Sequence, residues 1–192
     1  NTGMALIVGL MLAALVFAVL LPEHTMGHKD HIGRALWREA LHACTAPARR
    51  VKHRFDNRVR DLLSQLNAAA GPAPGEATRA VVRQALTLLE IGHSVIELRE
   101  LIATARPGAT RHALQQCVEH IAGWLRTRGD TALQAALAAT LQAGAVVRAA
   151  QAEVDASAER SARLQTALAD LHSIYTSLLD HMAPGAGDHH AA

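Results

Sequence analysis

The sequence predicts an all-α protein: one transmembrane helix followed by an antiparallel cytoplasmic helix bundle. Three observations carry this prediction. Residues 1–22 contain no charged residue, the rest of the chain shows apolar positions spaced three and four apart, and no useful length alternates apolar and polar residues. The mean hydropathy of +0.10 therefore averages two unlike parts.

The apolar run from Gly3 to Leu21 is long enough to cross a bilayer. Its nineteen residues would form a helix of roughly 28 Å, close to the thickness of the hydrocarbon core. A signal peptide is the alternative, but the first three residues bring no basic side chain and Pro22 follows the run in place of a small-residue cleavage site. We expect residues 1–22 to be a transmembrane helix, and the missing initiator Met suggests a piece of a longer protein.

Charge gives the expected orientation. Residues 22–60 contain nine Lys/Arg and four Asp/Glu, whereas residues 61–192 contain ten and thirteen. Because basic residues beside a span favour the cytoplasmic side, we expect residues 23–192 to be cytoplasmic. Cys44 and Cys117 fit that compartment as reduced core residues, since their spacing matches no metal site.

Pro, Gly and capping residues divide the remaining chain into helices of about 30–44, 47–70, 76–105, 110–127, 131 onward and 154–182. Whether residues 131–182 form one helix or two is left open, because the sequence between them contains no strong stop. The expected domains are a span at 1–22, a bundle at 23–183 and a disordered tail at 184–192. The expected inward positions of these helices are Ile32, Leu36, Trp37, Leu41; Phe55, Val59, Leu62, Leu63, Leu66; Val81, Val82, Ala85, Leu88, Leu89, Gly92, Val95, Ile96, Ile102; Leu114, Cys117, Val118, Ile121, Trp124, Leu125; Leu133, Leu137, Leu141, Val146; and Leu164, Leu168, Leu171, Ile174, Tyr175, Leu178, Met182.

Three histidines follow the span. His24, His28 and His31 have a spacing that would place them on one side of a helix, where they are weak candidates for a Zn²⁺ site. Pro22 and Gly27 weaken any helix there, so a solvated turn leaving the membrane is the preferred interpretation. We expect no metal and no cofactor.

A basic run covers residues 49–60. Nucleic acid is a poor partner for it, because Phe55 is its single aromatic residue and acidic residues interrupt the charge. Anionic lipid headgroups or acids on neighbouring helices suit it better. Among those acids, Glu90, Glu97 and Glu100 are expected to oppose this helix in ion pairs.

No catalytic residues are expected. Ser94, Ser173 and Ser177 lie near histidines in the sequence, but no nucleophile elbow, Cys/His arrangement or Gly-rich phosphate loop accompanies them. The sequence therefore predicts that the chain is not an enzyme.

Two stretches resemble a known family. Residues 54–63, RFDNRVRDLL, resemble the Arg-Phe-acid-x-Arg-apolar-x-Asp motif of the fusaric acid resistance family (FUSC), aromatic acid exporters of bacterial inner membranes. Residues 89–99, LEIGHSVIELR, are similar to that family's Leu-x-apolar-Gly-x-x-apolar-apolar-x-Leu-Arg helix. The matching positions, with structural roles expected, are Arg54, Phe55, Arg58, Asp61, Gly92 and Arg99.

The resemblance implies the C-terminal fragment of a larger efflux transporter of aromatic carboxylic acids or other toxic compounds. Its implied partners are the bilayer, the remaining spans, a periplasmic adaptor protein, an outer-membrane channel and a further copy in a homo-oligomer. Two alternatives stay open: a single-span, membrane-anchored interaction or signalling module, and a metal or ligand sensor that uses the histidines.

Overall fold

The computed structural model describes residues 31–70, 75–152 and 158–182, and every regular element in that part of the chain is a helix. An N-terminal helix over residues 31–45 precedes α2 (Ala48–Ala70), α3 (Glu76–Thr104), α4 (Ala109–Thr127), α5 (Asp130–Ala152) and α6 (Ala158–Met182). Residues 131–182 thus contain two helices, which answers the question that the sequence left open. The proposed span at 1–22 and the tail at 184–192 lie outside the described residues.

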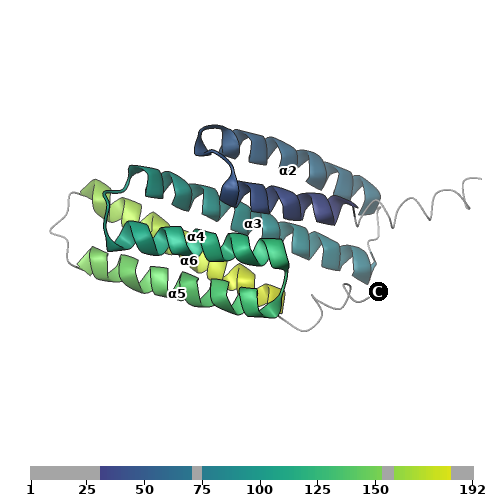
Figure 1. Cartoon of the computed structure of the whole chain (residues 1–192). Helices are drawn as coiled ribbons and strands as arrows, with labels where there is room; N and C mark the ends of the chain where they lie inside the picture. The colour runs from purple at the N-terminus through teal and green to yellow at the C-terminus, as the bar shows by residue number, and fades with distance from the viewer. Residues whose placement is uncertain (1–30, 71–74, 153–157, 183–192) are drawn as a thin grey trace, which may run out of the picture.

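Helices α3, α4, α5 and α6 form a bundle in which each packs against its neighbours in the chain, and α6 closes the ring by packing against α3. Helix α2 packs on α3, and helix 31–45 and α2 make a hairpin along the side of the bundle (Figure 1). Consecutive helices run in alternating directions along the long axis (Figure 1). The all-helical part of the predicted fold is therefore confirmed.

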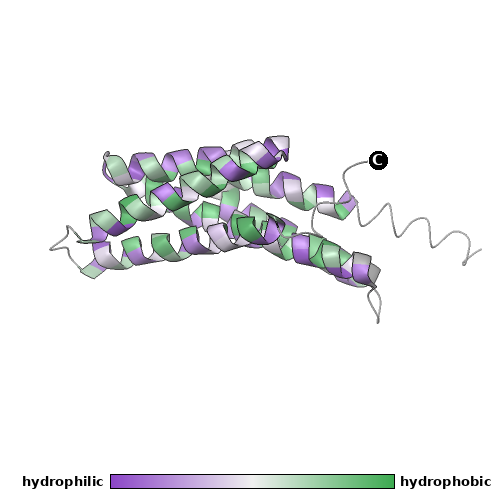
Figure 2. Cartoon of the chain, turned by 90° about the horizontal axis from the view of Figure 1, so that it is seen from below, coloured by the Kyte–Doolittle hydropathy of each residue, from purple (hydrophilic) through white to green (hydrophobic). Residues whose placement is uncertain are grey.

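One Leu/Val/Ala-rich core runs through the described residues. Figure 2 shows hydrophobic and hydrophilic segments alternating along the helices, as amphipathic helices require. All six positions predicted to face inward on α4 are buried: Leu114, Cys117, Val118, Ile121, Trp124 and Leu125. Both cysteines are free and buried, as expected.

The prediction for α5 was wrong at Leu141, which is 51% exposed. The buried line of α5 runs through Leu133, Leu137, Thr140, Gly144 and Val147, and Leu141 lies one position off it. Thr140 can occupy the core because its hydroxyl donates to the Ala136 carbonyl at 2.7 Å, which satisfies its polar group. The expected inward position Met182 is also exposed, at the very end of α6.

Within the described residues, α5 is also the helix long and apolar enough to cross a membrane by length and composition. It packs between α4 and α6, and 44% of its most apolar window is buried there. Packing in the bundle therefore accounts for its Ala/Leu composition.

An aromatic cluster joins helix 31–45 to the bundle. The Trp37 indole N–H donates to the Leu125 carbonyl at 2.5 Å, and the Trp37 and Trp124 rings meet edge to face at 5.2 Å. The His181 ring of α6 lies 5.2 Å from that of Trp124, and the Arg128 guanidinium lies 4.7 Å from the Trp37 ring centre. These contacts fix the N-terminal helix against the ends of α4 and α6.

Candidate functional site

Phe55 of α2 lies directly against Gly92 of α3. Both are buried, and a Cβ atom built on Gly92 would lie 2.3 Å from Phe55 Cζ. Only glycine leaves room for the ring at this position, because real Cβ atoms do not approach another carbon so closely. The motif that contains Phe55 and the motif that contains Gly92 are therefore two sides of one helix–helix contact.

Arg99, the arginine that ends the second motif, reaches the end of helix 31–45. Its guanidinium donates to the backbone carbonyls of Ala43 and Ala46. The last carbonyls of a helix have no partner within the helix and carry partial negative charge, so a guanidinium placed there both pairs and stabilises them. Arg99 thus links α3 to the connection between helix 31–45 and α2.

The other matched positions are peripheral. Arg54 approaches Glu39 at 3.9 Å with most of its side chain in solvent, and Arg58 and Asp61 are exposed on α2. The structure therefore brings Phe55, Gly92 and Arg99 into helix contacts but leaves these three on the surface. Their expected structural roles stay predictions.

A polar cluster lies on α3, whose two sides contact α2 and α6. Lys52 of α2 pairs with Glu97 of α3 at 2.5 Å, and His93 lies 3.9 Å from the same carboxylate. This is the ion pair expected between the basic helix and Glu97. Glu90, expected to pair with α2, instead accepts hydrogen bonds from Ser173 at 2.6 Å and Ser177 at 3.2 Å, both on α6.

Asp170 of α6 belongs to the same cluster, and the sequence did not predict its role there. Its carboxyl pKa is raised to about 6, mainly by burial and also by the nearby Glu97 carboxylate, while His93 opposes the shift. Its position in the sequence, within an ordinary amphipathic helix, gives no sign of this environment. The fold creates it by placing α6 beside α3.

The buried thiols are poorly reactive. Burial raises the pKa of Cys44 to about 12 and that of Cys117 to about 11. Because the thiolate is the nucleophile, neither thiol is suited to redox or covalent chemistry near neutral pH.

Of the candidate metal ligands, His31 is exposed at the start of helix 31–45, and His24 and His28 lie outside the described residues. Among residues 31–70, 75–152 and 158–182, no group of three His, Cys, Asp or Glu side chains is placed to hold a metal ion. The histidine site has no support from this part of the molecule.

A cavity of about 900 Å³ opens at one end of the bundle, where α3 turns into α4 and where α5 ends and α6 begins. We call it the end cavity. Its walls combine apolar side chains, among them Leu101, Leu114, Val146 and Leu164, with polar ones that include Arg106, Arg160 and Arg163. The sequence gives no sign of this cavity, because its lining combines three separate stretches of the chain that meet only in the folded bundle.

These features define a helical-bundle protein whose recognisable motifs hold an N-terminal hairpin on the bundle. The chain belongs to the fusaric acid resistance protein family (FUSC), whose family model matches residues 1–185. It is also 29% identical over 192 residues to the fusaric acid resistance protein FusD of Burkholderia cepacia, an alignment covering 96% of this chain and 91% of FusD. No solved structure matches the chain.

The family consists of membrane transport and resistance proteins, not typical enzymes. Membership therefore indicates a membrane protein with a part in efflux. The resemblance inferred from the two motifs is confirmed.

Proposed function

We propose that this chain is the C-terminal part of a bacterial inner-membrane efflux transporter that exports aromatic carboxylic acids or related toxic compounds. The match of the FUSC model over residues 1–185 carries the proposal, because it includes both the apolar N-terminal segment and the whole described bundle. The name of FusD points to fusaric acid, an aromatic carboxylic acid, as the compound to test first.

In this proposal residues 1–22 are the last membrane span and residues 23–183 are a cytoplasmic domain. The excess of Lys and Arg just after the apolar segment supports this orientation. A cysteine introduced at the exposed Ser64 of α2 tests it. A membrane-impermeant maleimide should label Ser64→Cys in inside-out vesicles and not in intact spheroplasts, while the buried native thiols give little background. Labelling in intact spheroplasts would contradict a cytoplasmic bundle.

The bundle's role in this proposal is assembly or regulation. Its hairpin of helix 31–45 and α2 would be the element nearest the membrane, and Arg99 and the Phe55–Gly92 contact couple that hairpin to α3. A displacement of the span would thereby reach the bundle through rigid contacts. The remaining spans, a second copy of the chain, a periplasmic adaptor protein and an outer-membrane channel are the proposed partners.

Transport of fusaric acid into inside-out membrane vesicles tests the function. Vesicles that contain the transporter should accumulate fusaric acid when a proton gradient is imposed and should lose it when a protonophore is added. Vesicles from a strain without the gene are the control. Equal accumulation by both kinds of vesicle would contradict the proposal.

A single-span, membrane-anchored interaction module is the second candidate. It is compatible with the apolar segment at residues 3–21 and the helical bundle that follows. The reading frame upstream of Asn1 separates the two. Five or more further hydrophobic spans in the same frame support the transporter, and a start codon immediately before Asn1 supports the module.

A further inference from the structure

We propose that one face of the N-terminal hairpin docks on the anionic lipid headgroups of the membrane that holds the chain. This face, which we call the basic face, is the outer side of helix 31–45 and α2, and it carries four exposed arginines: Arg34, Arg38, Arg54 and Arg58. The inference rests on the proposed span at residues 1–22 and adds a lipid partner to it. Its support is the placement of these arginines, the charge balance of the chain and the short connection to the span.

The fold gathers the four arginines on one side of the hairpin. Arg34 and Arg38 are four residues apart on helix 31–45, and Arg54 and Arg58 are four apart on α2, so each pair occupies one helix face. Arg54 approaches Glu39 at 3.9 Å, which places its pair on the edge of α2 that lies beside helix 31–45. Because the buried residues of both helices face the bundle, the arginines lie on the solvent side of the hairpin (Figure 1).

The net charge of this segment is positive wherever the residues outside the described part of the chain lie. Residues 22–61 contain nine Lys/Arg and five Asp/Glu, with residues 22–30 included in that count. The other residues outside the described part add three acids: Glu153, Asp155 and Asp188. Attraction to a charged bilayer depends on net charge and does not require any arginine to lack a partner. The surplus of basic residues therefore favours an anionic surface even with Glu39 close to Arg54.

The rest of the chain has the opposite charge balance. Residues 62–192 contain ten Lys/Arg and twelve Asp/Glu. Helix α5, which lies across the bundle from α2 (Figure 1), has no charged residue between Asp130 and Arg148. An anionic surface therefore attracts the hairpin side of the molecule more than any other side, and this difference turns the basic face toward the membrane.

The connection between the proposed span and the hairpin keeps the bilayer within reach. Ten residue-to-residue steps lead from Leu21 to His31, and fully extended they cover at most roughly 35 Å. A flexible tether of such length gives a local concentration of about millimolar. Each Lys or Arg close to an anionic surface then favours contact by roughly fivefold. An acidic protein has to be brought to the basic face, whereas the bilayer is always beside it.

Short-range quenching in lipid nanodiscs tests the docking. The full chain carries a fluorescent maleimide at Gln65→Cys, an exposed position two turns after Arg58 on the same face of α2, and the native thiols are buried. The nanodiscs contain a lipid with a spin-labelled headgroup in phosphatidylcholine alone or in an equal mixture with phosphatidylglycerol. We expect quenching to be at least about twofold stronger in the anionic nanodiscs, and this difference to vanish at about 1 M salt. Equal quenching in the two bilayers would overturn the proposal and leave an acidic protein as the occupant of the face.

Charge variants locate the contact. The variant Arg34→Gln/Arg38→Gln/Arg54→Gln/Arg58→Gln should reduce quenching in anionic nanodiscs to the level in phosphatidylcholine. Replacement of the same four arginines by Lys should leave quenching unchanged, because the attraction depends on charge. Full quenching in the Gln variant, or its loss in the Lys variant, would overturn the proposal.

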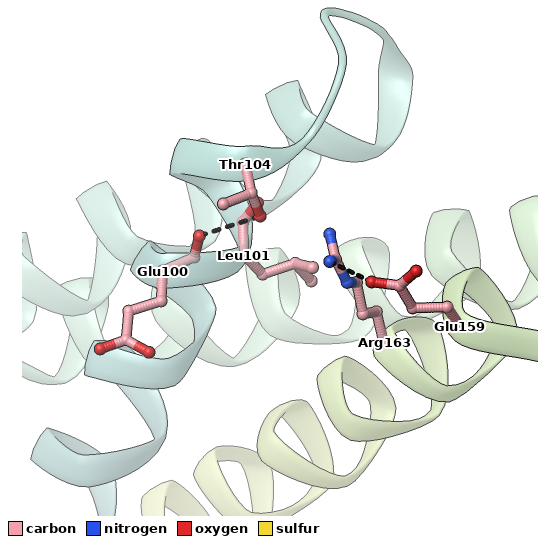
Figure 3. A network of polar contacts seen from close by, with 5 residues as sticks. All are labelled: Glu100, Leu101, Thr104, Glu159 and Arg163. Carbon is pink, nitrogen blue, oxygen red and sulfur yellow. Dashed lines mark hydrogen bonds and ion pairs between the residues drawn. The ribbon is translucent and has the colours of Figure 1, made fainter.

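A matched control removes the same charge from the far end of the bundle, where Figure 3 shows Arg163 paired with Glu159. It replaces four exposed arginines and should leave quenching unchanged: Arg106→Gln/Arg148→Gln/Arg160→Gln/Arg163→Gln. Equal loss of quenching in this control would show that no particular face docks, and would overturn the proposal.

The docking test is independent of export and of orientation in the cell, because both leaflets of a nanodisc contain the same lipid. Co-elution of the chain with the nanodiscs reports insertion of the span separately. An inserted chain without preferential quenching in anionic nanodiscs would overturn the lipid docking alone. A chain that fails to insert would contradict the proposed span and the docking that rests on it.

Discussion

The ring of Phe55 lies directly over Gly92, in the space that any other side chain at position 92 would need. One residue comes from each of the two stretches that resemble FUSC motifs. Their contact is where α2 meets α3, so it determines how closely the N-terminal hairpin approaches the bundle. Both motifs therefore contribute to the packing of α2 on α3.

Gly92→Ala should destabilise the chain by about 2 kcal/mol, because the added methyl forces Phe55 or α2 to move. Thermal unfolding of the purified chain, followed by circular dichroism, measures the effect. Gly123→Ala is the matched control, since a Cβ at this position on α4 meets nothing within 4 Å. That control should be neutral or stabilising by up to about 1 kcal/mol. Equal stability of Gly92→Ala and wild type would show that the contact is loose.

Arg99→Gln should cost about 2 kcal/mol of unfolding free energy, because charge-assisted hydrogen bonds to the Ala43 and Ala46 carbonyls are lost. The loss of stability should be greatest near the carbonyls that Arg99 pairs with. Amide hydrogen exchange is expected to quicken at the end of helix 31–45 more than in α4 or α5.

Arg83→Gln is the control for Arg99, since Arg83 lies on the same helix, is 73% exposed and only approaches Glu76 at 4.0 Å. Its replacement should change the unfolding free energy by less than about 0.5 kcal/mol. Exchange that is unchanged in Arg99→Gln at the end of helix 31–45 would refute the proposed capping role.

The raised pKa of Asp170 predicts that the unfolding free energy of the chain depends on pH. Its pKa of about 6 in the folded chain lies above the ordinary value of 3.8, so the folded state binds more protons than the unfolded state between these values. The contribution of Asp170 to stability should therefore decrease as pH rises from about 4 to 6 and stay low above that. Glu97 and His93, both on α3, are the titratable groups that act on it from a neighbouring helix.

Asp170→Asn should remove this dependence. Because the carboxyl is half-exposed, we expect a gain of only about 1 kcal/mol at pH 7.5, which disappears near pH 3.5. Urea unfolding at the two pH values measures it, and the exposed Asp180→Asn is the control. A loss of stability in Asp170→Asn at pH 7.5 would contradict a desolvated carboxylate.

Leu137 lies on the buried face of α5 and Leu141 on its exposed face. A polar substitution should therefore lower the unfolding free energy far more at Leu137 than at Leu141. Leu137→Gln places an amide in the core and should cost about 3 kcal/mol, because Leu137 is only 6% exposed. Leu141→Gln should change the unfolding free energy by less than about 0.5 kcal/mol, because Leu141 is half-exposed. Chemical unfolding compares the two variants. A larger cost at Leu141 would mean that its face is covered by lipid or protein.

The sequence predicts some of these elements better than others, for physical reasons. Helix α4 is predicted within a residue, because its apolar positions keep a strict helical spacing between Gly108 and Gly129. Helix α5 is apolar on several sides, so its own pattern does not decide which line faces inward. Its neighbours decide, and they select Thr140 over Leu141.

The site features depend on the fold to a greater degree. The motifs single out Phe55 and Gly92, but their contact needs α2 to lie on α3. The raised pKa of Asp170 needs the burial of its carboxyl in the folded chain and, second, Glu97 on a neighbouring helix. The end cavity needs the turn between α3 and α4 to lie beside α5 and the start of α6. Such environments leave no local pattern in a sequence.

The most direct test of the central proposal, that this FUSC chain takes part in efflux, is the intracellular concentration of labelled fusaric acid in growing cells. Deletion of residues 23–183 should raise that concentration and the sensitivity of the cells to fusaric acid. Expression of the intact gene should return both to the level of the undeleted strain. Gly92→Ala should restore them less well than Gly123→Ala at equal protein levels. Equal accumulation with and without residues 23–183 would contradict the proposal.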